Sequence, residues 1–269
     1  MKIEELHKIL YDILCAVDDA CKAEGVPYFL AGGTMLGAVR HKNIIPWDDD
    51  IDICVWKKDY PAMRAALLKH LPEHYRLIEP EELEPNFYDF VIRVQDLRHC
   101  WHEPTDEDRV YNNNQNYICV DIFTICECAN ANLTTNLYVL AHKITYGLAM
   151  GHRPKIHNEK YTLLQKLQTG VLSTVGKCIS MKKINSLYHW LEDLASAKEK
   201  KYCLLANDIP PFLRSGIETE WFRESVEAQF GDRTMPIPKG YHEYLTHIYG
   251  DYMQPPKDRS IYVSHAQLD

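Results

Sequence analysis

Residues 37–52 read GAVRHKNIIPWDDDID, and this stretch decides how the rest of the chain is interpreted. It ends with four carboxylates within five positions, Asp48, Asp49, Asp50 and Asp52. Like charges this close repel one another unless a cation lies among them, and a divalent metal ion is the usual cation. Ile51 and Ile53 alternate with the acids, as in a partly buried β-strand, so Asp50 and Asp52 would share one face of that strand. Two carboxylates on one face suit Mg²⁺ or Mn²⁺, which prefer oxygen ligands.

A third carboxylate is expected from a separate strand. Asp121 interrupts the otherwise apolar run Tyr117–Phe123, and an ionised Asp in such a run is costly unless it is paired or metal-bound. We therefore predict that Asp121 completes the metal site. Asp48 and Asp49 either support this site or are simply solvated in the loop. Acid-rich loops are also common as turns, so the prediction depends on these features occurring together.

A glycine turn precedes the acidic stretch. Gly32 and Gly33 follow the apolar, strand-like run 26–31 and permit a tight turn. We expect Thr34 to cap a short helix over Met35–Val39. Backbone N–H groups at such a helix start can bind phosphate oxygens. The turn is therefore a candidate phosphate site beside the metal site.

Two basic residues follow the expected helix. Arg40 could bind phosphate as a planar fork, and Lys42 could bind it as a point charge. Ordinary surface charge is the competing interpretation of both residues. His41, between them, is expected to pack or to form hydrogen bonds, and it stays outside the candidate catalytic set.

The composition restricts the class of protein. The chain has 269 residues, of which 46% are hydrophobic and 25% are charged, as is usual for a globular protein of one large or two small domains. A net charge of −8 argues against a broad nucleic-acid-binding surface. No apolar run approaches the roughly 20 residues of a membrane span. Nine cysteines without regular spacing fit a reducing compartment, so we expect a cytoplasmic protein, and peripheral association with a membrane stays open.

The hydrophobic pattern changes along the chain. Strands are expected near 51–55, 75–78, 88–96, 117–123 and 202–206, and helices over 3–21, 59–71, 133–150, 161–175 and 181–200. This order predicts an α/β (α+β) fold with three parts. The catalytic core would span 1–130, a helical insertion or subdomain 131–200, and a carboxy-terminal segment returning to the core 201–269.

The stretches 29–42 (FLAGGTMLGAVRHK), 45–53 (IPWDDDIDI) and 120–123 (VDIF) resemble the LicD family, which lies within the nucleotidyltransferase superfamily. Weaker similarity follows in MPIPKGY at 235–241 and in YGDY at 249–252. The resemblance implies a nucleotidyltransferase-like mixed β-sheet core flanked by helices. It also implies transfer of phosphocholine, or a related phospho-substituent, from CDP-choline or another CDP-linked donor. The acceptor would be a cell-surface glycan, teichoic-acid or lipopolysaccharide precursor, either free or lipid-linked.

The implied reaction gives further residues a role. A metal ion on Asp50 and Asp52 would neutralise the donor diphosphate, and Asp121 would share the metal ion or accept the proton of the acceptor hydroxyl as a general base. Lys239 could contact the donor phosphate if its segment folds back over the site. A quaternary ammonium group needs aromatic faces, for which Trp47 is the first candidate. Trp101, Trp221 and Tyr241 are alternatives, and core packing is the more common role of any one of these rings. Transfer of a nucleotide from an NTP, or ligand binding without catalysis, remains as a competing function.

Overall fold

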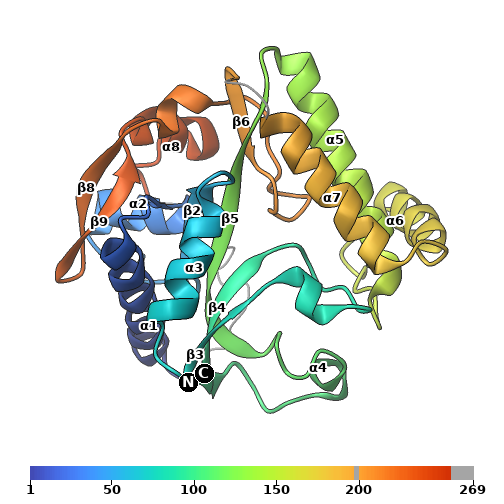
Figure 1. Cartoon of the computed structure of the whole chain (residues 1–269), viewed down its shortest axis with the longest axis horizontal. Helices are drawn as coiled ribbons and strands as arrows, with labels where there is room; N and C mark the ends of the chain where they lie inside the picture. The colour runs from blue at the N-terminus through green and yellow to red at the C-terminus, as the bar shows by residue number, and fades with distance from the viewer. Residues whose placement is uncertain (197–199, 256–269) are drawn as a thin grey trace.

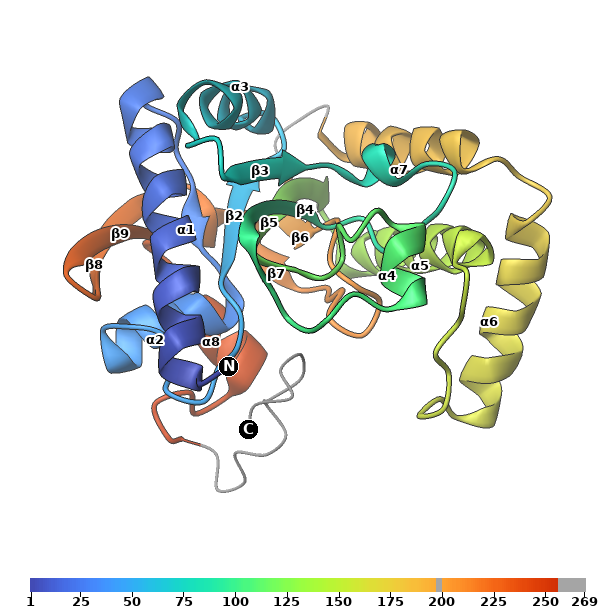
Figure 2. The ribbon, with the colours of Figure 1, turned by 90° about the horizontal axis from the view of Figure 1, so that it is seen from below.

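The structure is a computed structural model that describes residues 1–196 and 200–255 (Figures 1 and 2). Its centre is a curled seven-stranded sheet in which β1, β2, β5, β4 and β3 lie in that order. At its far end β5 also pairs with β6, and β6 pairs with β7. The strands are β1 Phe29–Leu30, β2 Asp52–Trp56, β3 Tyr75–Ile78, β4 Ile92–Cys100, β5 Tyr117–Ala129, β6 Tyr202–Leu205 and β7 Ile217–Glu218.

Pairing within this sheet is mixed. Strands β2 and β5 are parallel, whereas the remaining pairs of the sheet are antiparallel. The parallel pair is buried at the centre, and this explains the apolar runs of Ile and Val that both strands carry. The predicted α/β fold with a mixed sheet flanked by helices is therefore confirmed.

Helices cover the sheet on two sides of β5 (Figure 2). They are α1 Ile3–Glu24, α2 Gly32–His41, α3 Tyr60–His70, α4 Asp106–Val110, α5 Asn132–Ala149, α6 Leu163–Gly176, α7 Met181–Ser196 and α8 Tyr241–Tyr249. Helix α1 is amphipathic, and its buried face, which includes Leu6, Leu10 and Ile13, packs against the sheet and α3. Short 3₁₀ helices lie at Pro80–Leu83, Met150–His152 and Thr219–Phe222.

A buried polar cluster fastens α7 to the sheet. Glu192 of α7 is 1% exposed and accepts hydrogen bonds from Thr124 of β5 (2.9 Å) and from Tyr188 (3.0 Å). It also pairs with Lys57, which follows β2, and with Nδ1 of His189 at 3.0 Å. The other ring nitrogen of His189 lies 2.5 Å from Glu81. Helix α7 is thus held to β5, to the end of β2 and to the first 3₁₀ helix.

Several expected elements have different bounds. Strand β4 begins at Ile92 instead of residue 88, because Asp89 accepts a hydrogen bond from Val91 N (3.0 Å) and closes a turn there. Helix α7 ends at Ser196, and residues 197–199 of its expected range lie outside the described residues. The hairpin of β8 Ser225–Phe230 and β9 Arg233–Pro238 was not anticipated. Residues 256–269 of the expected carboxy-terminal segment also lie outside the described part of the chain.

Candidate active site

Two candidate acids lie at the start of the central parallel pair. Asp52 opens β2, and its register partner on β5 is Asp121. The backbone N–H of Asp121 also donates to the carbonyl of Ile51 at 2.9 Å, which fixes the alignment of the two strands. Because paired positions in neighbouring strands present their side chains on the same face, the two carboxylates lie beside each other.

The preceding loop brings three more carboxylates together. Asp48, Asp49 and Asp50 each offer a potential ligand atom, and these atoms lie within 4.8 Å of one another. Asp49 is 1% exposed, so it is not a solvated loop residue. Asp50 lies before β2, which begins at Asp52, so the expectation that both are strand residues is wrong in this detail. We use the term acidic group for the five carboxylates of Asp48, Asp49, Asp50, Asp52 and Asp121. The first three lie in the loop before β2, Asp52 begins β2, and Asp121 lies on the neighbouring strand β5.

The charges of this group act on one another. Burial raises the pKa of Asp52 well above its ordinary value, and the charges of Asp50 and Asp121 raise it further. An arrangement of this kind is electrostatically unfavourable unless a cation compensates it. Asp48, Asp49 and Asp50 offer carboxylate oxygens within 4.8 Å of one another, which is the donor set that hard divalent cations prefer. The residues present therefore fit a divalent metal ion.

The glycine turn forms the first turn of α2. The helix begins at Gly32 with Ala31 at the N-cap, so the expectation that Thr34 caps it is wrong. The Thr34 hydroxyl instead accepts a hydrogen bond from the backbone N–H of Asp52 at 2.8 Å, which ties the helix start to β2. The helix amino terminus, with its partial positive charge and its N–H groups, thus adjoins the acids.

Only glycine leaves room for this approach. A Cβ on Gly33 would lie 2.8 Å from Oδ2 of Asp48, and a Cβ on Gly32 would lie 3.1 Å from Oδ2 of Asp52. The same hypothetical atom on Gly32 would lie 3.9 Å from the hydroxyl of Tyr249, at the end of α8. The carboxy-terminal helix therefore returns to this site.

An arginine that the sequence reading missed pairs with one of the acids. Nε of Arg93, on β4, lies 3.1 Å from Oδ1 of Asp121, and its terminal nitrogens hold both oxygens of Asp89 at 2.8 and 2.7 Å. Burial disfavours the charge on Arg93, but Asp121 and Asp89 raise its pKa well above the ordinary value. The signal in the sequence was a basic residue within the apolar run FVIRV at 90–94.

A further acid was also missed. Asp208 follows β6, and burial together with the charge of Asp121 raises its pKa to about 7. The side chain of Asn207 places this loop against β5, because it accepts a hydrogen bond from Thr124 N (2.7 Å) and donates one to the carbonyl of Ile122 (2.8 Å). The sequence signal for Asp208 was the polar pair Asn207 and Asp208 directly after the apolar run 202–206.

The predicted basic residues have structural contacts of their own. A terminal nitrogen of Arg40 donates to the carbonyl of Tyr252 at 2.7 Å, so it joins α2 to the carboxy-terminal segment. Lys42 ends α2 in the left-handed conformation, and its Nζ donates to the carbonyl of Val39 at 3.2 Å. Arg40 lies in the last turn of α2 and Lys42 is its C-cap, so both are at the end of the helix opposite Gly32 and Gly33. Their proposed contact with phosphate stays a prediction.

Trp47 and Lys239, the side chains predicted to bind the donor, have different surroundings. Trp47 lies next to the acidic loop and meets the ring of His41 edge-on, with ring centroids 5.7 Å apart. Lys239 is exposed and forms an ion pair with Glu224 at 2.9 Å. The alternative cage residues Trp101, Trp221 and Tyr241 pack, partly buried, against the main core, as Trp47 also does. The structure thus places Trp47 beside the acids and gives Lys239 an acidic partner.

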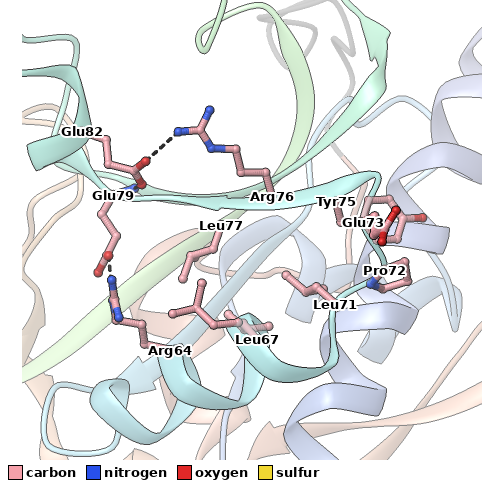
Figure 3. A pocket seen from close by; sticks show the side chains of 11 residues that line it. Arg64, Leu67, Leu71, Pro72, Glu73, Tyr75, Arg76, Leu77, Glu79 and Glu82 are labelled. Atoms are coloured by element: carbon pink, nitrogen blue, oxygen red, sulfur yellow. Dashed lines mark hydrogen bonds and ion pairs between the residues drawn. The ribbon is translucent and has the colours of Figure 1, made fainter.

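The aspartates of the acidic group do not line the cavity drawn in Figure 3. That cavity, of about 380 Å³, lies between α3 and β3, where Leu67, Leu71 and Leu77 form its apolar part. Ion pairs of Arg64 with Glu79 and of Arg76 with Glu82 border it. The candidate active site is therefore defined by the acidic group and the start of α2.

Comparisons with known proteins point to one family. Residues 25–147 match the family described as LicD/FKTN/FKRP, nucleotidyltransferase domain. The chain is 27% identical to the lipopolysaccharide cholinephosphotransferase LicD of Haemophilus influenzae, across 99% of this chain and 97% of that protein. The ribitol 5-phosphate transferase FKRP of Homo sapiens is 53% identical over 38 residues, which are 14% of this chain and 8% of that protein. An uncharacterized Rickettsia typhi protein is 40% identical over 68 residues, which are 25% of this chain and 22% of that protein.

Proposed function

Because this chain is a LicD-family phosphotransferase, with the family's nucleotidyltransferase domain at residues 25–147, we propose that it transfers phosphocholine or a similar phospho-substituent from a CDP-linked donor to a glycan precursor. The observation that carries the proposal is the acidic group beside the start of α2, within a chain similar over nearly its whole length to a cholinephosphotransferase. The acceptor would be a precursor of lipopolysaccharide or another surface glycan, met at the cytoplasmic face of a membrane.

The donor diphosphate would bind between the acidic group and the glycine turn. Asp50, Asp52 and Asp121 would hold Mg²⁺ or Mn²⁺, which would neutralise negative charge on the diphosphate. Asp48 and Asp49 lie close enough to share this function. The N–H groups of Gly32 and Gly33 could bind phosphate oxygens at the helix start.

The transfer step requires a nucleophile and a leaving group. An acceptor hydroxyl oxygen would attack the phosphorus of the phosphocholine group while the bond from that phosphorus to the bridging oxygen breaks. CMP would leave with the bridging oxygen, and Asp121 would accept the hydroxyl proton. Arg93, which binds Asp121 at 3.1 Å, would hold this carboxylate in position. Trp47 would offer a ring face to the quaternary ammonium group.

The proposal is tested by following what leaves the donor. The protein would be incubated with Mg²⁺ or Mn²⁺, a glycan precursor, and in turn CDP-choline, CDP-ethanolamine or CDP-ribitol. Acceptor-dependent release of CMP supports the proposal, and the best donor identifies the transferred group. Release of pyrophosphate from CTP, with incorporation of CMP into an acceptor, would instead show nucleotidyl transfer. Donor binding without turnover of any of these compounds would indicate a ligand-binding protein.

A matched pair of variants makes the test specific. Asp121→Asn keeps the size of the side chain and removes its charge, so it should abolish the release of CMP. Asp12→Asn makes the same change on α1, where Asp12 forms an exposed ion pair with Lys8, and should leave the rate unchanged. Equal rates for the two variants would contradict the assigned role of Asp121.

A further inference from the structure

Helix α6 presents its apolar face to solvent. The large apolar side chains of this face are between 49% and 88% exposed: Leu163, Leu164, Leu167, Val171 and Val175. At 100° per residue they fall on one stripe about 120° wide. A helix of a globular protein normally turns such a stripe toward the core. Here the stripe points away from the rest of the protein.

Small residues hold α6 in this orientation. Its inward face carries Ser173 and Gly176, both of which are buried. A Cβ on Gly176 would collide with the backbone of Leu148 in α5, and a Cβ on Gly151 would collide with the backbone of α6. The two backbones therefore touch, and the packing leaves no space for the leucines to turn inward. The exposed stripe is a consequence of how the helix is seated.

The segment of the sequence that contains α6 is basic. Between Cys128 and Leu191 the chain has eight basic residues and one acidic residue, Glu159, although the net charge of the whole chain is −8. Lys160, Lys166 and Lys177 flank or belong to α6, and all three are exposed. Among residues 1–196 and 200–255, no helix is both long and apolar enough to cross a membrane. Apolar side chains bordered by lysines are typical of a helix that lies in the surface of an anionic bilayer.

Helices α5 and α7 also expose large apolar side chains to solvent. Exposed stripes continue on α5 at Leu133, Leu137, Leu140 and Ile144, and on α7 at Leu187, Trp190 and Leu194. Figures 1 and 2 show α6 at the end of the molecule opposite the β8–β9 hairpin. We propose that the outward face of α6 is a membrane-docking surface that inserts its leucines among anionic lipids. This inference rests on the proposed function, which places the acceptor at a membrane. It names the surface of the protein that would contact that membrane.

A second copy of the chain fits this face less well. A symmetric contact through α6 would bring Lys166 and its flanking lysines of two copies together, with Glu159 as the single acidic residue between Cys128 and Leu191 to compensate them. Anionic lipid head groups compensate the same lysines directly. The charge therefore favours a lipid surface as the occupant.

The experiment is flotation of the full chain with lipid vesicles, without donor or acceptor. Vesicles of phosphatidylcholine mixed with phosphatidylglycerol should carry the protein upward, whereas vesicles of phosphatidylcholine alone should bind it more weakly. The double variant L167Q/V171Q should lower the partition coefficient about tenfold or more, because it removes two inserted apolar side chains. Leu68→Gln makes a similar change at an exposed leucine of α3 and should bind as the unchanged protein does.

Two further measurements keep the outcomes distinct. The variant K166E/K177E should lose the preference for anionic vesicles, and its circular dichroism should show that α6 is retained. Equal vesicle binding by L167Q/V171Q and the unchanged protein, or no binding by either, would overturn the proposal. A dimer in sedimentation that L167Q/V171Q dissociates would assign the face to a second copy instead. Transfer to a short water-soluble acceptor tests the chemistry separately, so failure of docking and failure of the proposed reaction can be told apart.

Discussion

Asp52 and Asp121 are register partners on the parallel strands β2 and β5, and their carboxylates lie side by side at one edge of the candidate site. The strand pairing brings together two residues that are far apart in the sequence. Arg93 compensates Asp121 from the next strand, at 3.1 Å. The charge of Asp121 nevertheless contributes to the raised pKa of Asp52. This pair therefore has a repulsive cost that a bound cation would remove.

Replacing Asp52 with Asn should separate catalysis from stability. We expect the transfer rate to fall by about 10²–10³-fold or more, because a group that stabilises the charged transition state is lost. Without divalent cations the Tm should stay equal or rise, because a buried charge next to Asp50 and Asp121 has been removed. Activity assays and thermal unfolding in EDTA check both expectations. A large fall in Tm would mean that Asp52 is primarily structural.

Divalent cations should stabilise the folded chain. A cation at 100 times its dissociation constant contributes about 2.7 kcal/mol, which corresponds to a rise in Tm of about 5–10 °C for a chain of this size. Titration of Mg²⁺ and Mn²⁺ after treatment with EDTA measures the effect. The double variant D50N/D52N should lose it, whereas Asp12→Asn should keep it. A shift of equal size in D50N/D52N would place the cation elsewhere.

The hydroxyl of Thr34 should be required for the position of β2. Thr34→Val keeps the shape of the side chain but leaves the N–H of Asp52 without its acceptor, which costs about 1–3 kcal/mol for a buried group. Thr34→Ser retains the hydroxyl, so the midpoint of its urea unfolding should be close to that of the unchanged protein. Urea unfolding of the two variants provides the comparison. Equal loss of stability in both would show that the methyl group, and not the hydroxyl, is what matters.

The link between α7 and the sheet should weaken in alkali. Hydrogen bonds to Glu192 and Glu81 raise the pKa of His189 from 6.5 to about 9, so the protonated ring is favoured by folding. Its contribution is complete below pH 6.5 and is lost as the pH rises through 9. The difference in unfolding free energy between the unchanged protein and His189→Gln should therefore shrink over this range. A difference that is constant or grows would contradict the assigned contacts of His189.

The sequence predicted those parts of the site that are local. Alternation of acids with Ile51 and Ile53 indicated a strand, although β2 begins only at Asp52, and the break in the apolar run at Asp121 indicated a third carboxylate. A metal site that includes Asp52 and Asp121 required their two strands to be neighbours. Strands β2 and β5 are neighbours, and their register pairs these two residues. The predicted strand segments correspond to β1–β6, whereas β7 and the order of the strands within the sheet were not predicted.

Other features depend on contacts that no local pattern shows. Arg93 and Asp208 reach the site through β4 and through the loop that Asn207 attaches to β5. Each stands out as a polar residue in or after an apolar run, but their positions in the sequence do not show that they lie near Asp121. Thr34 had the sequence features of a helix cap, but the close approach of β2 gave its hydroxyl another donor. The apolar stripe of α6 would normally be read as core, and only the small residues on its opposite face reveal that it points outward.

Strand β5 is 13 residues long, and it carries Asp121 near its start and leads directly into α5 after Ala129. Asp121 and α5, which packs against the proposed docking helix α6, are therefore attached to one continuous, hydrogen-bonded element. If the proposed docking holds, the enzyme would set the height of the transferred phosphate above the bilayer. A growing glycan could be modified only at the sugar that reaches this height, so the enzyme would select the position of the substituent along the chain by length as well as by chemistry.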